Sequence, residues 1–472
     1  MREELSPVRL LISALVAANI FLCSGCGGQA RYTDSARGEG DKRAKQFAEL
    51  LIPIALDSAG RASSSDLARV VEAVGRPRAV LLSEQAHGDG ATIALNAELA
   101  ISFHREGRAQ LLATESGLFD AEETWANRFR AHRGGRYLEG AVHGTWSATA
   151  QFAPVLNYVQ TTIHSLSAFQ LAGFDNQLTG PVAQQEFANK LRAAVTEMKI
   201  DTAALEDWNG GMRILDSLLH VPGNSQRWTA EQERRFVRLF NSLENMMAAD
   251  EKGRRRVHFW RQMMRSTRSY GLQHFRSVFD SVRGEIGDVN IRDAQMAENF
   301  LWLLEDTSVP GAIVWAAALH GARDLTAIES GDTAYVNELH RYVPMGAKLA
   351  SVLGSDYFAI GTLAVEGSTG HSFVGGPEWN LPRPESGSLE ALFAQLPFDA
   401  AFLPLRNLPP TAQWLLDSLW GRPFGYAPVK AVWPRLFDGL IFIRRQHPTT
   451  SPQVRGETCL FRSFLAGKCE QH

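Results

Sequence analysis

Seven short apolar runs, separated by longer stretches with helical periodicity, place the tightest limits on how this chain can fold. The runs are AVLL (79–82), QLLAT (110–114), FQLAGF (169–174), AIVWA (312–316), YFAIGTL (357–363), DAAFL (399–403) and GLIFI (439–443). Buried strands that alternate with helices favour right-handed crossovers and parallel pairing. The sequence therefore predicts an α/β fold with a mainly parallel sheet, flanking helices and functional residues at the carboxyl ends of the strands.

The segment from about 181 to 285 has helical periodicity and no strong strand signal. Thr229 and Gln232 form a capping-box pair at the start of one helix. Apolar residues then recur at spacings of three and four: Phe236, Leu239, Phe240, Leu243, Met246 and Met247. We expect a helical subdomain inserted into one α/β domain that extends from 44 to 450.

The N-terminus has the pattern of an export signal. Arg2 and Arg9 precede the apolar run LLISALVAANIFL, which is too short to span a bilayer comfortably, and small residues follow it up to Cys26. This ending resembles a bacterial lipoprotein signal, in which Cys26 becomes the lipidated first residue. We therefore expect a signal at 1–26, a polar tether at 27–43 and a lipid-anchored protein in the cell envelope. A plain cleaved signal or a short anchor is the alternative.

Two further cysteines, Cys459 and Cys469, lie in a C-terminal tail at 451–472. In an oxidising envelope they are placed to close a short loop, and two independent thiols are the equally weighted alternative.

The charge balance limits the partners of the chain. Its 472 residues include 48 Lys and Arg against 51 Asp and Glu, and 45% are hydrophobic. This composition excludes a disordered chain and gives no electrostatic reason to expect nucleic acid.

Ionisable residues follow three successive predicted strands. Glu84 and His87 lie in the Gly-rich turn SEQAHGDG after the first strand, Glu115 follows the second, and Asp175 follows the third. The carboxyl ends of parallel strands meet at one edge of a sheet, so these side chains are expected to lie together. A carboxylate beside a histidine is typical of general-base chemistry.

Two later segments extend this pattern. IRDAQMAENFLWLL (291–304) reads as a helix in which Arg292 and Asn299 share one face, and His320 follows the fourth strand. An inward-facing arginine needs a carboxylate or an anionic group of the substrate. Each residue also has a structural alternative. Arg292 could form an ion pair, for instance with Glu115, and His320 could cap a helix or turn.

These residues together carry a resemblance to a known family. The motifs are Ser83-Glu84-x-x-His87-Gly88, Glu115, Gly173-Phe174-Asp175-x-Gln177, Arg292-Asp293-x-x-Met296-Ala297-Glu298-Asn299, Trp315 with His320, and Met345-Gly346. In this order, over residues 79 to 370, they resemble the erythromycin esterase family. The resemblance implies an α/β protein with a helical part over a cleft, and hydrolysis of an ester or lactone by a histidine-activated water without a covalent intermediate.

The resemblance also implies roles for individual residues. His87 would be the general base, Glu84 would orient it, and Glu115, Arg292 and His320 would line the same site. The remaining site residues, expected to contact substrate, are Asp175, Asp293 and Asn299. A small-molecule ester or lactone, not necessarily an antibiotic, is the expected substrate, and neither a cofactor nor a metal is expected. The chain contains no GxSxG motif for a nucleophilic serine.

Three positions depart from the family pattern. Ala317 and Ala318 stand where a His-Asn pair is usual, Ser83 replaces a glycine, and Asn96 stands where an arginine is often found. A non-catalytic relative that binds a small ligand is therefore an alternative. A metal-dependent hydrolase is another, because Glu84, His87, Glu115 and His320 offer oxygen and nitrogen ligands.

Overall fold

The computed structural model describes residues 43–129, 137–220, 228–248, 255–276, 287–371 and 375–452. The predicted signal and nearly all of the tether lie outside these residues, and so do Cys26, Cys459 and Cys469. The anchor and the disulfide therefore stay predictions.

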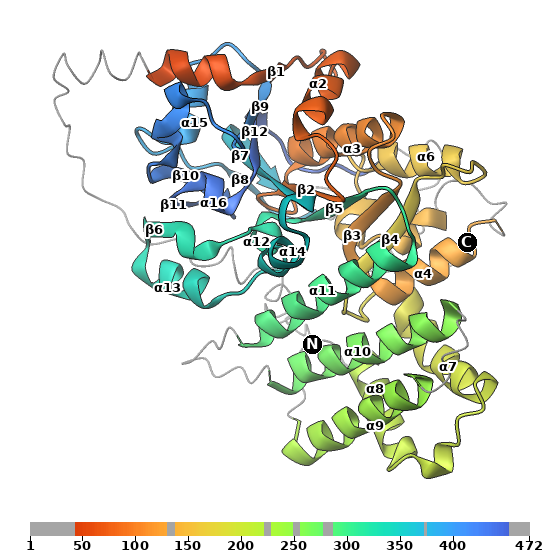
Figure 1. The fold of residues 1–472 in the computed structure, drawn as a ribbon. Helices are drawn as coiled ribbons and strands as arrows, with labels where there is room; N and C mark the ends of the chain where they lie inside the picture. Colours follow the sequence, from red (N-terminus) through yellow and green to blue (C-terminus); the bar gives the residue numbers. More distant parts are fainter. Residues whose placement is uncertain are drawn as a thin grey trace, which may run out of the picture.

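Among the described residues, one large sheet of nine strands forms the centre of the molecule (Figure 1). Its strands in spatial order are β1 (Ile52–Ile54), β9 (Ala400–Pro404), β12 (Gly439–Gln446), β7 (Tyr357–Gly370), β2 (Ala79–Glu84), β5 (Ala312–Ala317), β3 (Leu111–Gly117) and β4 (Gln170–Asp175), with β8 (Glu378–Asn380) paired to β7. The strands from β12 to β4 run parallel, whereas β9, β1 and β8 pair antiparallel. The predicted α/β fold with a mainly parallel sheet is confirmed, and all seven predicted strands are present.

The central strands bury both of their faces. In β2, Leu81 packs into one apolar core and its neighbours Val80 and Leu82 pack into another. This alternation follows from the two-residue period of a strand, and it explains why these strands read as continuous apolar runs. Helices α2 (Ser64–Val74), α3 (Gly90–Arg105) and α6 (Ala153–Thr162) contribute to the core that holds Val80.

Between β4 and β5, the described residues form helices and the loops that connect them, and no strand. This segment contains α7 (Pro181–Glu197), α8 (Trp208–His220), α9 (Ala230–Ala248), α10 (Arg255–Arg276) and α11 (Gly287–Asp306). Helices α7 to α10 gather beyond one end of the sheet, and α11 runs between them and the sheet (Figure 1). The predicted capping box is present, since Thr229 N donates to Gln232 Oε1 at 2.9 Å and Gln232 N donates to Thr229 Oγ1 at 3.2 Å.

A second, antiparallel sheet was not expected from the sequence. It consists of β10 (Leu419–Phe424), β11 (Ala427–Ala431) and β6 (Ile328–Gly331). Gly425 and Tyr426 form the tight turn between β10 and β11, and both have positive φ, as a two-residue hairpin turn requires. Gly425 N donates to Gln85 O at 3.0 Å, so this hairpin supports the loop after β2.

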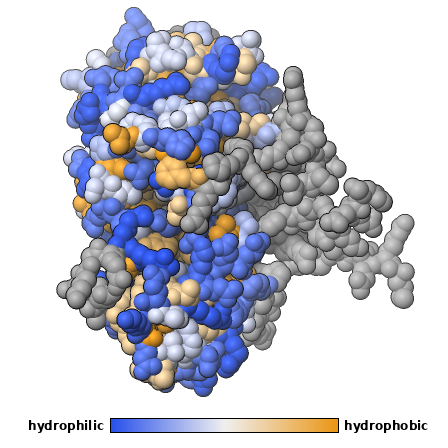
Figure 2. Space-filling view, turned by 90° about the vertical axis from the view of Figure 1, so that its right-hand side faces the viewer, coloured by the Kyte–Doolittle hydropathy of each residue, from blue (hydrophilic) through white to orange (hydrophobic). Residues whose placement is uncertain are grey.

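The remaining elements are short. They are a helix at 43–50, α4 (Leu118–Ala126), α5 (Gly144–Ser147), α12 (Ala318–Gly321), α13 (Thr333–Arg341), α14 (Met345–Leu353), α15 (Leu389–Ala394), α16 (Trp433–Leu436), and 3₁₀ turns at Tyr137–Ala141, Thr202–Ala204, Leu325–Ala327, Gly354–Asp356 and Pro410–Leu416. Hydrophilic residues predominate on the face shown in Figure 2, and hydrophobic residues form small groups. In the described part of the chain, no helix has the length and apolar character needed to cross a membrane.

Candidate active site

The first part of the site is a carboxylate and an imidazole at the end of β2. Glu84 is fully buried, and its Oε1 lies 2.7 Å from Nδ1 of His87, whose side chain is 29% exposed. The indole N–H of Trp146 donates to both oxygens of Glu84, at 2.8 and 3.0 Å, and that of Trp315 donates to Oε2 at 3.3 Å. These bonds fix the carboxylate, and the carboxylate fixes the ring. Nε2 of His87 is left as the nitrogen that faces away from Glu84.

The loop that carries His87 is held by the ends of two strands. The carbonyl of Gly88 accepts from Thr449 N at 3.1 Å and from Gly370 N at 3.3 Å. A side chain at Gly88 would place its Cβ 2.7 Å from Gly370 N, so the close approach requires glycine. This packing restrains the backbone directly after His87.

The second part of the site is built around Arg292 on α11. Its Nη2 donates to Glu115 Oε1 at 2.8 Å and to Asp175 Oδ2 at 2.6 Å, and its Nε donates to Asp175 Oδ1 at 3.2 Å. The other oxygen of Glu115 accepts from Ala317 N at 3.1 Å. Arg292 thereby joins the carboxyl ends of β3 and β4 to the helical segment.

His320 on α12 completes this second group. Its Nδ1 lies 2.9 Å from Asp293 Oδ1 and 2.8 Å from the Tyr342 hydroxyl. Its Nε2 lies 3.3 Å from Glu115 Oε1 and 3.1 Å from Arg292 Nη1. Each ring nitrogen therefore lies near a carboxylate that stabilises a charged imidazolium, Asp293 at Nδ1 and Glu115 at Nε2.

The charges of the two groups act on one another. Burial lowers the pKa of His320, but Asp293 and Glu115 outweigh burial and raise that pKa to about 10. Burial also raises the pKa of Glu115, but the charges of His320 and Arg292 hold it well below its usual value. For His87, burial lowers the pKa, and the Glu84 hydrogen bond with the Glu84 and Glu115 charges raises it above 6.5. At neutral pH the site thus holds a charged His320, and the His87 pKa lies above its ordinary value.

Comparison with known proteins identifies the family. The family model for erythromycin esterase matches residues 110–446, well over half of the chain. The chain belongs to the erythromycin esterase family. Its relatives include a putative hydrolase, YbfO, of Bacillus subtilis, which is 22% identical over 83% of this chain and 89% of the relative. Erythromycin esterase type II of Escherichia coli is 26% identical over 37% of this chain and 41% of its own length. The chain is accordingly a hydrolase of the erythromycin esterase family.

Solved structures show the same fold. A Bacillus cereus protein superposes with a TM-score of 0.69 at 18% identity, and the match covers 90% of this chain and 100% of the other. An erythromycin esterase mutant in its open conformation superposes with a TM-score of 0.61 at 16% identity, over 84% of this chain and 97% of the other. At these identities the likeness shows the fold alone.

The structure brings all eight predicted site residues to the carboxyl edge of the sheet, but it gives the three predicted substrate contacts other roles. Asn299 is fully buried: its amide donates to Phe174 O at 2.9 Å and its oxygen accepts from Gln262 at 2.8 Å. Asp293 is also fully buried and faces His320. Asp175 is paired with Arg292 and only 4% exposed. Buried side chains with their polar atoms occupied hold other residues in place, so we replace the prediction of substrate contact by a positioning role.

Four side chains at or beside the site were missed from the sequence. Trp146 and His143 lie on or beside the four-residue helix α5, which is too short for a periodic signal. Tyr342 reaches His320 from the end of α13. Asp89 was visible in the motif after β2, but nothing in the sequence shows that it is buried.

The donor atoms of the site bear on the metal-dependent alternative. Within the ranges that the structure describes, no group of three or more His, Cys, Asp or Glu side chains is arranged to hold a metal ion. Both oxygens of Glu84 accept from indole N–H groups, and Glu115 is bonded to Arg292 and a backbone N–H. A metal here would displace these bonds, so the geometry favours chemistry by the side chains themselves.

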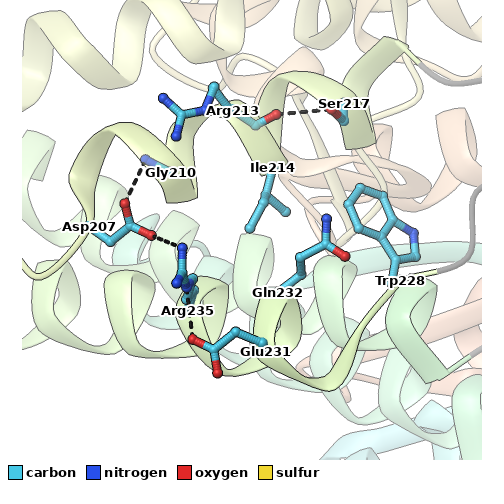
Figure 3. Close-up of a pocket in the computed structure, with 9 residues that line it drawn as sticks. All are labelled: Asp207, Gly210, Arg213, Ile214, Ser217, Trp228, Glu231, Gln232 and Arg235. Atoms are coloured by element: carbon cyan, nitrogen blue, oxygen red, sulfur yellow. Dashed lines mark hydrogen bonds and ion pairs between the residues drawn. The ribbon is translucent and has the colours of Figure 1, made fainter.

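A pocket in the helical segment lies apart from this site. It is lined by residues of α8 and α9 and their flanks, among them Asp207, Arg213, Trp228 and Arg235 (Figure 3). Arg235 Nη1 lies 3.0 Å from Asp207 Oδ2, and its Nε lies 2.8 Å from Glu231 Oε1. These charges compensate one another, and no predicted site residue lines the pocket, so we place the chemistry at the sheet edge.

Proposed function

We propose that this protein hydrolyses an ester or lactone with a water molecule that His87 activates as general base. The observation that carries the proposal is the pair of Glu84 and His87, joined at 2.7 Å with a buried carboxylate and a partly exposed ring. A general base near neutral pH needs an oriented imidazole with one free nitrogen, and Nε2 of His87 fits this requirement.

The reaction follows from this geometry. Nε2 of His87 takes a proton from water while the water oxygen attacks the carbonyl carbon of the substrate. The electron pair of the C=O bond moves to oxygen and gives a tetrahedral oxyanion. Collapse of this intermediate breaks the C–O bond of the ester, and the leaving oxygen takes the proton from His87. The products are a carboxylic acid and an alcohol, which stay joined as one hydroxy acid when the substrate is a lactone.

The second group of the site supports the same chemistry. Arg292 and His320 both carry positive charge at neutral pH, and their side chains are 15% and 11% exposed. Cationic N–H groups at the border of a site stabilise a developing oxyanion. Glu115 and Asp175 hold the guanidinium in place.

The test is a panel of esters and lactones, read by the gain of one water in the mass of the product. We expect the wild type to hydrolyse at least one member, and the His87→Ala variant to be slower by about 10²–10⁴-fold. A folded wild type that binds panel members without hydrolysing any would favour the ligand-binding alternative. Loss of activity on chelation, with recovery on adding a divalent metal, would favour the metal-dependent alternative.

We also propose that the protein is exported and attached to a membrane through a lipid on Cys26. The short apolar run before Cys26 and the small residues that separate them support this localisation. The polar segment that follows would let the enzyme domain face a small-molecule substrate in the envelope.

A further inference from the structure

His143 lies beside residues that belong to both parts of the site. Its backbone N donates to Ser116 Oγ at 2.8 Å, which ties it to the residue after Glu115. Its ring packs edge-on against Trp146 with a centroid distance of 6.2 Å, and the His87 ring packs against the same indole at 5.3 Å. His143 is thus placed beside both the base and the Glu115 group.

The hydrogen bonds of the His143 ring determine which nitrogen carries the proton. His143 is the N-cap of α5, and its Nδ1 accepts from Thr145 N at 3.3 Å. In a neutral ring whose Nδ1 is an acceptor, Nε2 carries the hydrogen. The residue as a whole is exposed, so solvent and small molecules reach it.

The surroundings favour the neutral ring. Desolvation by the surrounding protein and the charge of His87 lower the pKa of His143, and the nearby Asp175 and Glu115 carboxylates do not reverse this. The Arg292 charge acts in the same direction as that of His87. His143 is therefore a neutral donor at the pH at which His87 works as a base.

Several other N–H groups near the site already donate to protein acceptors, and His143 adds a donor beside the cations Arg292 and His320. Arg292 donates through Nε to Asp175 and through Nη2 to Asp175 and Glu115. At the start of α3, Gly90 N donates to His447 O at 2.8 Å and Ala91 N donates to Gln446 Oε1 at 2.7 Å. The backbone N–H groups of Gly90 and Ala91 at the N-terminus of α3 are thus already bonded and do not donate to the substrate.

We propose that Nε2–H of His143 donates a hydrogen bond to the carbonyl oxygen of the substrate and stabilises the oxyanion that forms there. This inference rests on the proposed function and adds a catalytic residue to it. The donor is neutral and held by its own helix cap, so no reorganisation is needed as charge develops.

The test compares His143→Asn with His143→Ala. Asparagine is a preferred N-cap residue, so His143→Asn keeps an acceptor for Thr145 N while removing the Nε2–H group. We expect both variants to lose about 10²–10³-fold in kcat, with the acid side of the pH profile unchanged. The control is His258→Asn, which changes an exposed histidine of α10 and should leave kcat unchanged.

A purely structural role of His143 predicts a different result. If His143 only caps α5, His143→Asn will retain the wild-type kcat while His143→Ala loses it. That result would overturn the inference and leave the proposed function intact, provided His87→Ala is inactive in the same assay.

Binding of the ethyl butylphosphonate monoanion, a mimic of the tetrahedral intermediate, gives a second readout that needs no turnover. We expect the wild type to bind it at least about tenfold more tightly than His143→Asn, since the lost hydrogen bond meets a charged acceptor. Equal binding by both proteins, or no binding by either, would contradict the inference even if no hydrolysed substrate is found.

Discussion

The indole N–H of Trp146 donates to both carboxylate oxygens of Glu84, and the indole ring also packs against the ring of His87. The two rings meet edge-on at an interplanar angle of 87°. Trp146 therefore controls both the orientation of the carboxylate and the space available to the base. A change at this tryptophan should therefore affect catalysis as well as core packing.

The Trp146→Phe variant removes the donor while keeping an aromatic ring. We expect kcat to fall by about tenfold or more, because Glu84 loses part of the network that orients it. We also expect the acid side of the pH profile to move to higher pH, since a carboxylate with fewer donors interacts more strongly with an imidazolium. Steady-state kinetics across pH is the measurement.

Trp433→Phe is the matched control for this variant. Trp433 is fully buried and donates to Leu419 O at 2.9 Å, away from the site. Its loss should lower the melting temperature without moving the pH profile. If both variants change the profile in the same way, Trp146 acts through general packing.

The pH dependence of kcat/KM should be bell-shaped. Only neutral His87 accepts a proton, and its pKa is raised above 6.5, so activity should fall as the pH drops through a value above 6.5. Charged His320 is lost near pH 10, where activity should fall again. An acid side centred clearly below 6.5 would contradict the Glu84 contact.

His320 should also affect stability at high pH. Its folded pKa of about 10 exceeds the ordinary 6.5, so its stabilising effect is complete below 6.5 and is lost as the pH rises through about 10. Unfolding measured alongside the kinetics will separate loss of the charged catalyst from loss of the fold.

Asp89 gives stability a pH dependence of the same sign as His320, and opposite to that of a carboxyl group held by a salt bridge. It is fully buried, and burial raises its pKa from 3.8 to about 7 against the opposing hydrogen bonds from Thr369 and Tyr426. Between these pH values the folded chain retains a proton that the unfolded chain has released. The contribution of Asp89 to stability therefore falls as the pH rises from 3.8 to about 7.

The Asp89→Asn variant tests this dependence. Asparagine resembles the protonated acid, so we expect the variant to gain stability relative to the wild type when the pH is raised from 5 to 8. Urea unfolding at both pH values is the measurement, and Asp356→Asn, at an exposed position, is the control. A difference between wild type and Asp89→Asn that stays constant with pH would show that Asp89 is ionised throughout.

The sequence predicted the sheet edge as the place of the site because apolar runs mark buried strands well. It did not show which partner each polar residue takes. Arg292 and Asn299 share a helix face, but Arg292 meets two strand ends and Asn299 is enclosed by α10 and β4. Such partners depend on how α11 packs, which local periodicity does not specify.

The same reasoning explains the strands that were missed. β8 is exposed along its whole length, and β1 has three residues, so neither gives a clear apolar run. β9 was expected as a strand, but its antiparallel direction depends on the path of the chain through α15 and not on its own residues.

The anchor has a direct test in the cell. Changing Cys26 to Ser should leave the precursor unprocessed or release the protein into the soluble fraction, because a lipoprotein signal needs the cysteine thiol for lipid attachment. Fractionation with mass measurement of the mature N-terminus is the readout. Unchanged processing and membrane association of the variant would rule out the lipid anchor.

The central claim is that the imidazole of His87 performs the proton transfer. The most direct measurement is kcat/KM of folded His87→Ala on any ester hydrolysed by the wild type, with and without added imidazole. We expect a loss of about 10²–10⁴-fold and a partial recovery that increases with the concentration of neutral imidazole. A His87→Ala variant with the wild-type kcat/KM would contradict the account.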